Sequence, residues 1–176
     1  MKNKTDMKHN LSRLPYRLCV GITLLNHENK VFIGKRRSKK GQEYYSNSYA
    51  WQMPQGGIDA HENPYDAALR ELYEETNISS VEFLAESPEW YCYDLPPEMI
   101  GNSWKGRYRG QKQKWFALRF TGQESEIDTL HPADDKYRPE FDDWRWEDMG
   151  KLTELIIPFK KDVYKKVIDD FSYLVQ

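Results

Sequence analysis

The sequence predicts an α/β fold, a sandwich built around a central mixed β-sheet. Short apolar and β-branched runs, which are typical of strands, recur along the whole chain. Two amphipathic helical patterns, over residues 64–76 and 160–174, lie far apart with strand-like segments between them. Strands interleaved with well-separated helices favour a sheet with helices packed on it.

The length and composition indicate one domain. The chain has 176 residues, of which 39% are hydrophobic, enough for one core without disulfide or metal support. Residues 1–14 are polar and carry no apolar period, so we expect a flexible N-terminal tail there and a single domain over 15–176.

The charge balance and the apolar runs exclude two classes of protein. Lys and Arg number 26 and Asp and Glu number 28, so the net charge of -2 excludes a generally positive surface, and any nucleic-acid contact must be local. No apolar run approaches the ~20 residues of a membrane span, and residues 1–9 carry no apolar signal segment. We therefore expect a cytoplasmic protein with no membrane contact.

The first elements in order are a hairpin, a loop and a short strand. Residues 17–25 and 31–34 are apolar and flank a polar turn at 26–29, which predicts the hairpin. Basic and polar residues over 35–48 indicate a loop, and residues 51–53 form the short strand.

The strongest helix signal follows. Asn63 is a good N-cap, Pro64 suits the first helical position, and Asp66 complements the helix dipole. The helix should end near Asn77. At 100° per residue, one sector of about 100° holds the core-facing residues Tyr65, Ala68, Leu69, Leu72 and Thr76.

The second half alternates strands and loops before the last helix. Strand-like segments occupy 81–84, 90–95, 114–120 and 144–146. Residues 99–110 read as a glycine-bearing basic loop, and 123–138 as an irregular polar stretch. The helix over 160–174 is predicted by the spacing of Val163, Val167, Phe171 and Leu174.

Three carboxylates gather on one side of the first helix. Glu71, Glu74 and Glu75 stand at i, i+3 and i+4, where like charges repel by a few tenths of a kcal/mol per pair. A solvated acidic face is one explanation. The other is a divalent cation, since Mg²⁺ takes oxygen ligands and commonly binds carboxylates together with substrate phosphates. Spacing alone leaves both open.

The residues around these carboxylates carry a motif. From Gly56 to Ile78 the sequence resembles the Nudix box, which reads Gly, five residues, Glu, seven residues, Arg-Glu, aliphatic, any residue, Glu-Glu, any residue, Gly, aliphatic. Asn77 stands in place of the last glycine, and Asn readily adopts the left-handed conformation that ends such a helix. The matching positions are Gly56, Glu62, Arg70, Glu71, Leu72, Glu74, Glu75 and Ile78.

The resemblance implies a fold, an activity and a metal. The family has an α/β/α sandwich with a central mixed sheet and hydrolyses a nucleoside diphosphate linked to another group. By resemblance, Mg²⁺ or Mn²⁺ would be bound, as two or more ions with substrate present, and Zn²⁺ is a further option. The implied ligands on the helix are Glu71, Glu74 and Glu75.

The other motif positions receive supporting roles from the same resemblance. Arg70 would orient the glutamates, and Glu62 would brace the turn from loop to helix. Gly56 and Gly57 would let the backbone approach the metal, with Gly56 as a further ligand.

Segments outside the motif resemble one branch of the family, which acts on RNA 5′ ends and on dinucleoside polyphosphates. The resemblance extends from about residue 15 to residue 171 and is carried by 90–96, 110–116, 139–146 and 158–164. It implies that Glu140 is a fourth metal ligand or the general base.

Candidate substrate-binding residues follow from the branch and from residue chemistry. Phe159 and Tyr93 are candidate platforms for a base, with Tyr16 a third, because stacking on an aromatic ring is worth about 1 to 3 kcal/mol. Ordinary core packing is the alternative for each ring, and a plain surface cation is the alternative for each basic residue. Basic candidates for phosphate are Arg17, Lys112, Lys114 and Lys160, with Arg36 and Arg37 as further cations.

The resemblance favours removal of pyrophosphate from the 5′-triphosphate end of RNA, which initiates mRNA decay. Hydrolysis of dinucleoside polyphosphates such as diadenosine tetraphosphate is the close alternative, because it uses the same metals and glutamates. A non-catalytic nucleotide sensor is the second alternative, and a missing motif glutamate would favour it; none is missing. The expected partners are thus 5′-triphosphorylated RNA or dinucleoside polyphosphates. The sequence does not indicate a protein partner, an oligomeric state or a role in host invasion.

Overall fold

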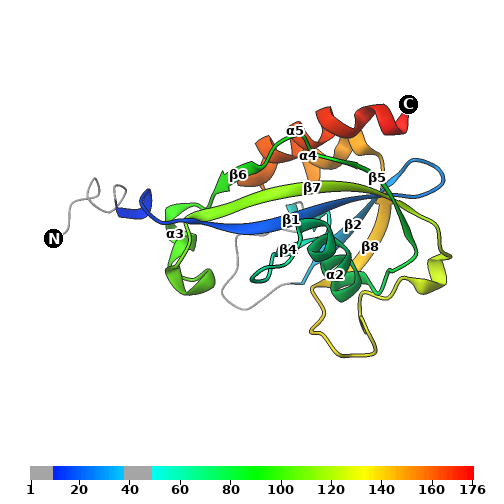
Figure 1. Ribbon diagram of the computed structural model, residues 1–176, viewed down its shortest axis with the longest axis horizontal. Helices are drawn as coiled ribbons and strands as arrows, with labels where there is room; N and C mark the ends of the chain where they lie inside the picture. The colour runs from blue at the N-terminus through cyan, green and yellow to red at the C-terminus, as the bar shows by residue number, and fades with distance from the viewer. Residues whose placement is uncertain (1–9, 38–48) are drawn as a thin grey trace.

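The computed structural model describes residues 10–37 and 49–176, and it confirms the α/β fold (Figure 1). Helix α2 (Pro64–Thr76) covers one face of the central sheet. Helices α4 (Leu152–Leu155) and α5 (Lys161–Phe171) cover the other. The molecule is therefore an α/β/α sandwich.

The central sheet is mixed. Its two long central strands, β1 (Tyr16–Leu25) and β7 (Gly110–Phe120), run parallel over ten residue pairs, and the other pairs are antiparallel. The main path runs β3-β2-β1-β7-β5, with β4 on β1, β6 on β7 and β8 on β2. The remaining strands are β2 (Val31–Arg36), β3 (Trp51–Gln52), β4 (Gln55–Gly57), β5 (Val81–Glu86), β6 (Tyr91–Asp94) and β8 (Phe141–Glu147).

Burial of the central strand follows from helices on both faces. The seven residues from Cys19 to Leu25 are all buried, as expected for a strand with both sides covered. One core cluster includes Val20 and Leu72 on the α2 face. The other includes Trp115 and Val163 on the α5 face.

The predicted hairpin forms, but its strands separate at once. Leu25 pairs with Val31, and beyond this point β2 pairs with β3 and β8. The short strand β4 pairs with residues 19–21 of β1 instead. Sequence analysis assigned no strand to β4, because a three-residue Gln-Gly-Gly segment has no apolar period. This departure of β2 from β1 makes room for the site described below.

Helix α2 forms as predicted. The Asn63 side chain accepts a hydrogen bond from the N–H of Tyr65 at 2.9 Å, and Pro64 occupies the first turn. Asn77 ends the helix with φ 66°, the left-handed conformation expected for it.

Several boundaries differ from the predicted ones. Strands β2, β7 and β8 are longer than predicted because neighbouring strands recruit polar residues into the ladder. The loop expected at 99–110 contains helix α3 (Pro97–Ile100) and the 3₁₀ turn η2 (Trp104–Gly106), and η3 (Glu124–Glu126) lies in the irregular stretch. The last helical pattern divides into η5 (Pro158–Lys160), α5 and η6 (Ser172–Val175), and η4 (Met149–Lys151) precedes α4.

The expected N-terminal tail is described only in part. Residues 1–9, like residues 38–48 of the predicted loop, lie outside the described residues. Leu11 and Leu14 pack against the core, and Arg109 Nη1 donates to the carbonyl of Ser12 at 2.9 Å. Residues 11–14 therefore contact the domain, whereas the boundary at residue 15 stays a prediction. Within the described residues, no helix combines the length and apolar character that crossing a bilayer requires.

Candidate active site

The site is a cavity of about 400 Å³ beside β4, at the place where β2 departs from β1. Its walls come from α2, β4, β6, β7, the α3–η2 segment and η5. Its lining residues include acidic, basic and aromatic side chains. They are Arg17, Arg36, Gln55, Gly56, Gly57, Glu71, Glu75, Tyr93, Leu95, Met99, Asn102, Ser103, Trp104, Gln111, Glu140, Phe159 and Lys160.

One wall is acidic. Glu71 and Glu75 line the cavity from α2, because residues four apart lie about 40° apart around a helix. Glu140 reaches the same cavity from the segment just before β8. Glu74 is absent from the lining, since its helix position points elsewhere and Arg70 Nη1 lies 3.4 Å from its Oε2. The structure thus gathers three of the four predicted carboxylates.

Burial raises the pKa of the two cavity carboxylates on α2, Glu71 and Glu75. Glu75 is only 8% exposed, and its pKa is raised well above the ordinary range, first by desolvation and then by the charges of Glu71 and Glu140. Desolvation likewise raises the pKa of Glu71 to about 7, against the opposing effect of Arg70. The backbone N–H of Gln55 donates to Glu75 at 3.3 Å. Carboxylates forced together in this way favour a nearby positive charge.

Arg70 and Glu62 connect the loop to the helix. Arg70 Nε and Nη2 each donate to a different carboxylate oxygen of Glu62 at 2.8 Å, and Nη2 also donates to the Gly57 carbonyl at 2.8 Å. These bonds lower the pKa of Glu62 to about 2. Arg70 Nη1 donates to Glu71 at 3.0 Å, so one guanidinium contacts the loop and a cavity carboxylate together.

Two glycines let side chains pass close to β4. A Cβ added to Gly56 would fall 1.9 Å from Cδ of Glu71. A Cβ added to Gly57 would fall 2.3 Å from Nη2 of Arg17. Only glycine therefore leaves room for both charged groups beside β4.

The donor set fits a divalent cation, although the side chains do not stand as a ready-made ligand group. No three His, Cys, Asp or Glu side chains within residues 10–37 and 49–176 are placed to share an ion as they lie. Glu71 is held by Arg70, which competes with a cation for its oxygen. Buried, mutually repelling carboxylates supply the hard oxygen donors that Mg²⁺ and Mn²⁺ prefer, so the residues present fit such an ion after side-chain rotation.

A buried lysine lies beside β3 and β4. Lys160 is 3% exposed, and its Nζ lies 3.4 Å from the amide oxygens of Gln52 and Gln55. Desolvation, and then the charge of Arg36, lower the pKa of Lys160 to about 7. Arg36 itself forms an ion pair with Glu140 at 3.5 Å.

Aromatic rings flank these cations. The Phe159 and Tyr93 rings lie 5.6 Å apart, tilted by 39°, and Lys160 Nζ lies 5.4 Å from the Tyr93 ring centre. Arg17 lies over the Trp104 ring at 5.6 Å. Tyr16 does not line this cavity and instead borders a neighbouring hollow of about 290 Å³ that also contacts Phe159 and Tyr93.

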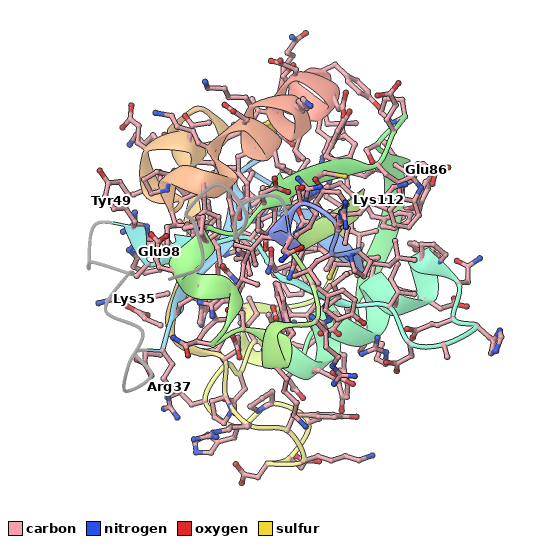
Figure 2. All side chains as sticks on the ribbon, turned by 90° about the vertical axis from the view of Figure 1, so that its left-hand side faces the viewer. Lys35, Arg37, Tyr49, Glu86, Glu98 and Lys112 are labelled. Carbon is pink, nitrogen blue, oxygen red and sulfur yellow. The ribbon has the colours of Figure 1, made fainter. Side chains whose placement is uncertain are left out.

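Two candidate phosphate contacts lie outside the cavity, and their role stays a prediction. Neither Lys112 nor Lys114 lines the cavity, because alternation along β7 directs Gln111 and Gln113 to that side. Lys112 is exposed near the Trp90 ring, and Lys114 donates to the carbonyl of Ser87. In Figure 2, Lys112 lies well apart from Arg37, which stands at the lower left of the view. Arg37 does not line the cavity and forms an ion pair with Asp142 at 2.6 Å.

Part of the wall was not expected from the sequence. It consists of residues of the α3–η2 segment, which was predicted to be a loop, namely Met99, Asn102, Ser103 and Trp104. Trp104 and Lys105 have φ of 49° and 56°, followed by Gly106 at 70°. A tryptophan followed by Lys-Gly in a basic loop was the available signal for this wall.

Comparison with known proteins decides the family. The sequence profile described as "NUDIX domain" matches residues 15–171. This chain belongs to the Nudix family. The match spans the acidic and basic walls together, which confirms the resemblance seen in the motif. The family consists of hydrolases that cleave pyrophosphate bonds with the help of divalent metals.

Individual Nudix proteins give the same result. An RNA pyrophosphohydrolase of Rhodopseudomonas palustris is 55% identical over 161 residues, which is 92% of this chain and 94% of that protein. An RNA pyrophosphohydrolase of a Bradyrhizobium species is 55% identical over 92% of this chain and 95% of its own. The E. coli dihydroneopterin triphosphate pyrophosphohydrolase structure covers 88% of this chain and 98% of its own, with a TM-score of 0.61 and 14% identity. That likeness shows the Nudix fold alone.

Proposed function

We propose that this Nudix hydrolase removes pyrophosphate from the 5′-triphosphate end of RNA and so initiates mRNA decay in the cytoplasm. The observation that carries the proposal is 55% identity over 92% of the chain to relatives that bear the name RNA pyrophosphohydrolase. The cavity supports it, since acidic, basic and aromatic side chains together line a volume of about 400 Å³.

The acidic wall is proposed to hold the divalent ions. Glu71, Glu75 and Glu140 would be the ligands, with the Gly56 backbone beside them. Bound Mg²⁺ or Mn²⁺ would neutralise charge on phosphate oxygens and acidify a water molecule. Glu74 lies outside the cavity lining, so its share in ion binding depends on release from Arg70.

The remaining residues have proposed roles in binding and proton transfer. Arg17 and Lys160 bind the triphosphate, and Phe159 with Tyr93 stacks on a base near the 5′ end. Glu140 accepts the proton of the attacking water, because its side chain is 29% exposed while Glu75 is enclosed. The water oxygen then bonds to phosphorus, the P–O bond to pyrophosphate breaks, and an RNA 5′-monophosphate remains.

The test is parallel turnover, with Mg²⁺, of a short 5′-triphosphorylated RNA and of diadenosine tetraphosphate. We expect kcat/KM to favour the RNA at least about tenfold, which corresponds to ~1.4 kcal/mol. Glu75→Gln is the blank and Glu82→Gln, an exposed position on β5, is the matched control. Preference for the dinucleotide would contradict the proposal.

Hydrolysis of dinucleoside polyphosphates is the second candidate, and one observation favours it. Aromatic side chains line the cavity from separate segments, Phe159 on η5 beside Tyr93 on β6, and Trp104 on η2. Two such aromatic groups suit a substrate with two bases. The turnover ratio above discriminates the two candidates directly, and loss of both activities would favour a nucleotide sensor.

A further inference from the structure

Glutamine side chains from three strands meet at the floor of the cavity. Gln52 lies on β3, Gln55 on β4, and Gln111 and Gln113 on β7. Gln55 and Gln111 line the cavity. Gln113 does not line it and is only 1% exposed, so its amide lies entirely within the protein.

The indole of Trp115 determines how the Gln113 amide is turned. Trp115 Nε1 lies 3.2 Å from Gln113 Oε1. An indole N–H can only donate a hydrogen bond, so the amide atom facing it must be the oxygen. The amide nitrogen of Gln113 must then face the other way. This assignment follows from donor chemistry, which is the sound basis for orienting a glutamine amide.

The orientation of the Gln113 amide also determines how two further amides are turned. Gln113 Nε2 lies 3.0 Å from Gln55 Oε1 and 2.8 Å from Gln111 Oε1. Because an amide NH₂ group only donates, both neighbours must present their oxygens to Gln113. Lys160 Nζ also lies beside Gln55 Oε1, at 3.4 Å, in agreement with that orientation.

The two amides that line the cavity therefore present nitrogen to it. Among the side-chain hydrogen bonds of the described residues, none uses Gln55 Nε2 or Gln111 Nε2 as the donor. Gln55 also contacts the acidic wall through its backbone N–H, which donates to Glu75 at 3.3 Å. N–H donors between a carboxylate wall and a cationic wall lie where a substrate oxyanion would be bound.

We propose that Gln113 is a positioning residue that fixes Gln55 and Gln111 as a pair of N–H donors to substrate phosphate oxygens. Gln113 itself touches no substrate. Its buried amide accepts a hydrogen bond from the Trp115 indole, and this bond fixes the orientation in which the amide donates to Gln55 and Gln111. The inference rests on the proposed function, because it takes a polyphosphate as the ligand.

The test compares KM and kcat for 5′-triphosphorylated RNA in Gln113→Met and Gln113→Glu, with Gln123→Met at an exposed position as the matched control. Gln113→Met removes the orienting amide, so we expect KM to rise about tenfold, or ~1.4 kcal/mol, with kcat within about twofold. An ionised glutamate at position 113 can only accept hydrogen bonds, so Gln113→Glu should turn both neighbouring amides around. We therefore expect a larger rise in KM for this variant.

A purely structural role predicts a different pattern. Combined with Gln55→Met and Gln111→Met, Gln113→Met should change KM less than about twofold, since its targets are already gone. A further tenfold rise in that background, or an unchanged KM in both single variants, overturns the proposal. If Gln113→Met does not fold, Trp115→Phe replaces it, because a smaller aromatic ring remains and the indole donor is lost.

The outcome is separable from that of the proposed function. If the wild-type protein leaves the RNA intact but hydrolyses diadenosine tetraphosphate, the RNA substrate is wrong. The same variants are then compared on the dinucleotide, whose phosphate oxygens would bind to the same donors. If the wild-type protein hydrolyses RNA and the KM of the variants does not change, the proposed function stands and the role of Gln113 is wrong.

Discussion

The carboxylate of Glu71 occupies the space in which a side chain at Gly56 would lie. A Cβ at position 56 would fall 1.9 Å from Glu71 Cδ and 2.1 Å from its Oε2. The atoms in conflict are the far end of a flexible side chain, so the Glu71 carboxylate can move aside without a change in the backbone. The glycine is thus a requirement of the site more than of the fold.

Gly56→Ala should therefore remove activity and spare stability. We expect kcat/KM for the preferred substrate to fall at least about 100-fold, because Glu71 must leave the cavity, while Tm changes by less than about 4 °C. Steady-state kinetics and thermal unfolding check the two effects. Gly150→Ala, where an added Cβ meets nothing within 4 Å, is the control. An active Gly56→Ala enzyme would exclude Glu71 from the site.

Arg70 should not tolerate replacement by lysine. Its guanidinium contacts both oxygens of Glu62, the Gly57 carbonyl and Glu71 at once, and a lysine ammonium cannot reproduce that planar fork. We expect Arg70→Lys to lower kcat about 10- to 100-fold and to lower Tm by a few degrees. Arg145→Lys, where the arginine side chain is 43% exposed and pairs with Glu147, is the matched control. Full activity in Arg70→Lys would show that the loop needs no bidentate contact.

The sequence predicted the helix-borne half of the site better than the other half. Spacing around α2 is fixed by helix geometry, so Glu71, Glu75 and Arg70 could be placed from the motif alone. The position of Lys112 and Lys114 relative to the cavity could not be predicted, because a strand alternates its faces every residue and sequence does not show which face meets the cavity. Trp104 was missed because its wall depends on left-handed backbone at residues 104–106, which no apolar period signals.

Asn77 is the one departure from the family motif, and the structure shows what it adds. Its Oδ1 accepts from the N–H of Ala133 at 3.1 Å, and its Nδ2 donates to the Glu126 carbonyl at 3.1 Å. Asn77→Gly should relieve backbone strain at φ 66°, but it also removes two hydrogen bonds to the 126–133 segment. We therefore expect the free energy of unfolding to fall by about 1 kcal/mol. Chemical denaturation measures this difference. A more stable Asn77→Gly protein would show that backbone strain outweighs both bonds.

Phe159 should act on binding more than on chemistry. Its ring lines the cavity beside Tyr93 but lies on η5, away from the carboxylates of α2. Because stacking is worth about 1 to 3 kcal/mol, Phe159→Ala should raise KM about 5- to 100-fold with kcat within about threefold. Phe159→Tyr keeps the ring and should restore KM. An unchanged KM in Phe159→Ala would remove this ring from the substrate pocket.

Glu71 and Lys160 should together give the stability of the metal-free protein a minimum near pH 7. The pKa of Glu71 is raised to about 7 and that of Glu75 is raised well above the ordinary range, so the folded state holds protons that the unfolded state has released above about pH 4.3. The contribution of Glu71 to the free energy of unfolding therefore falls as pH rises from about 4.3 to 7, and that of Glu75 falls from about 4.3 upward. The pKa of Lys160 is lowered to about 7, so between pH 7 and about 10.4 the unfolded state binds the extra proton. Stability contributed by this group rises over that range.

Thermal unfolding in the presence of a chelator, from pH 5 to pH 9.5, measures both limbs of this profile. Glu71→Gln combined with Glu75→Gln should flatten the acid limb, because the raised carboxyl pKa values are then gone. Lys160→Met should flatten the alkaline limb alone. Mg²⁺ should raise Tm most at pH 8, where its carboxylate ligands are more fully ionised, and hardly at pH 5, where protons compete for the same oxygens. A pH profile unchanged by these substitutions would mean that the cavity groups are hydrated in solution and titrate at ordinary values.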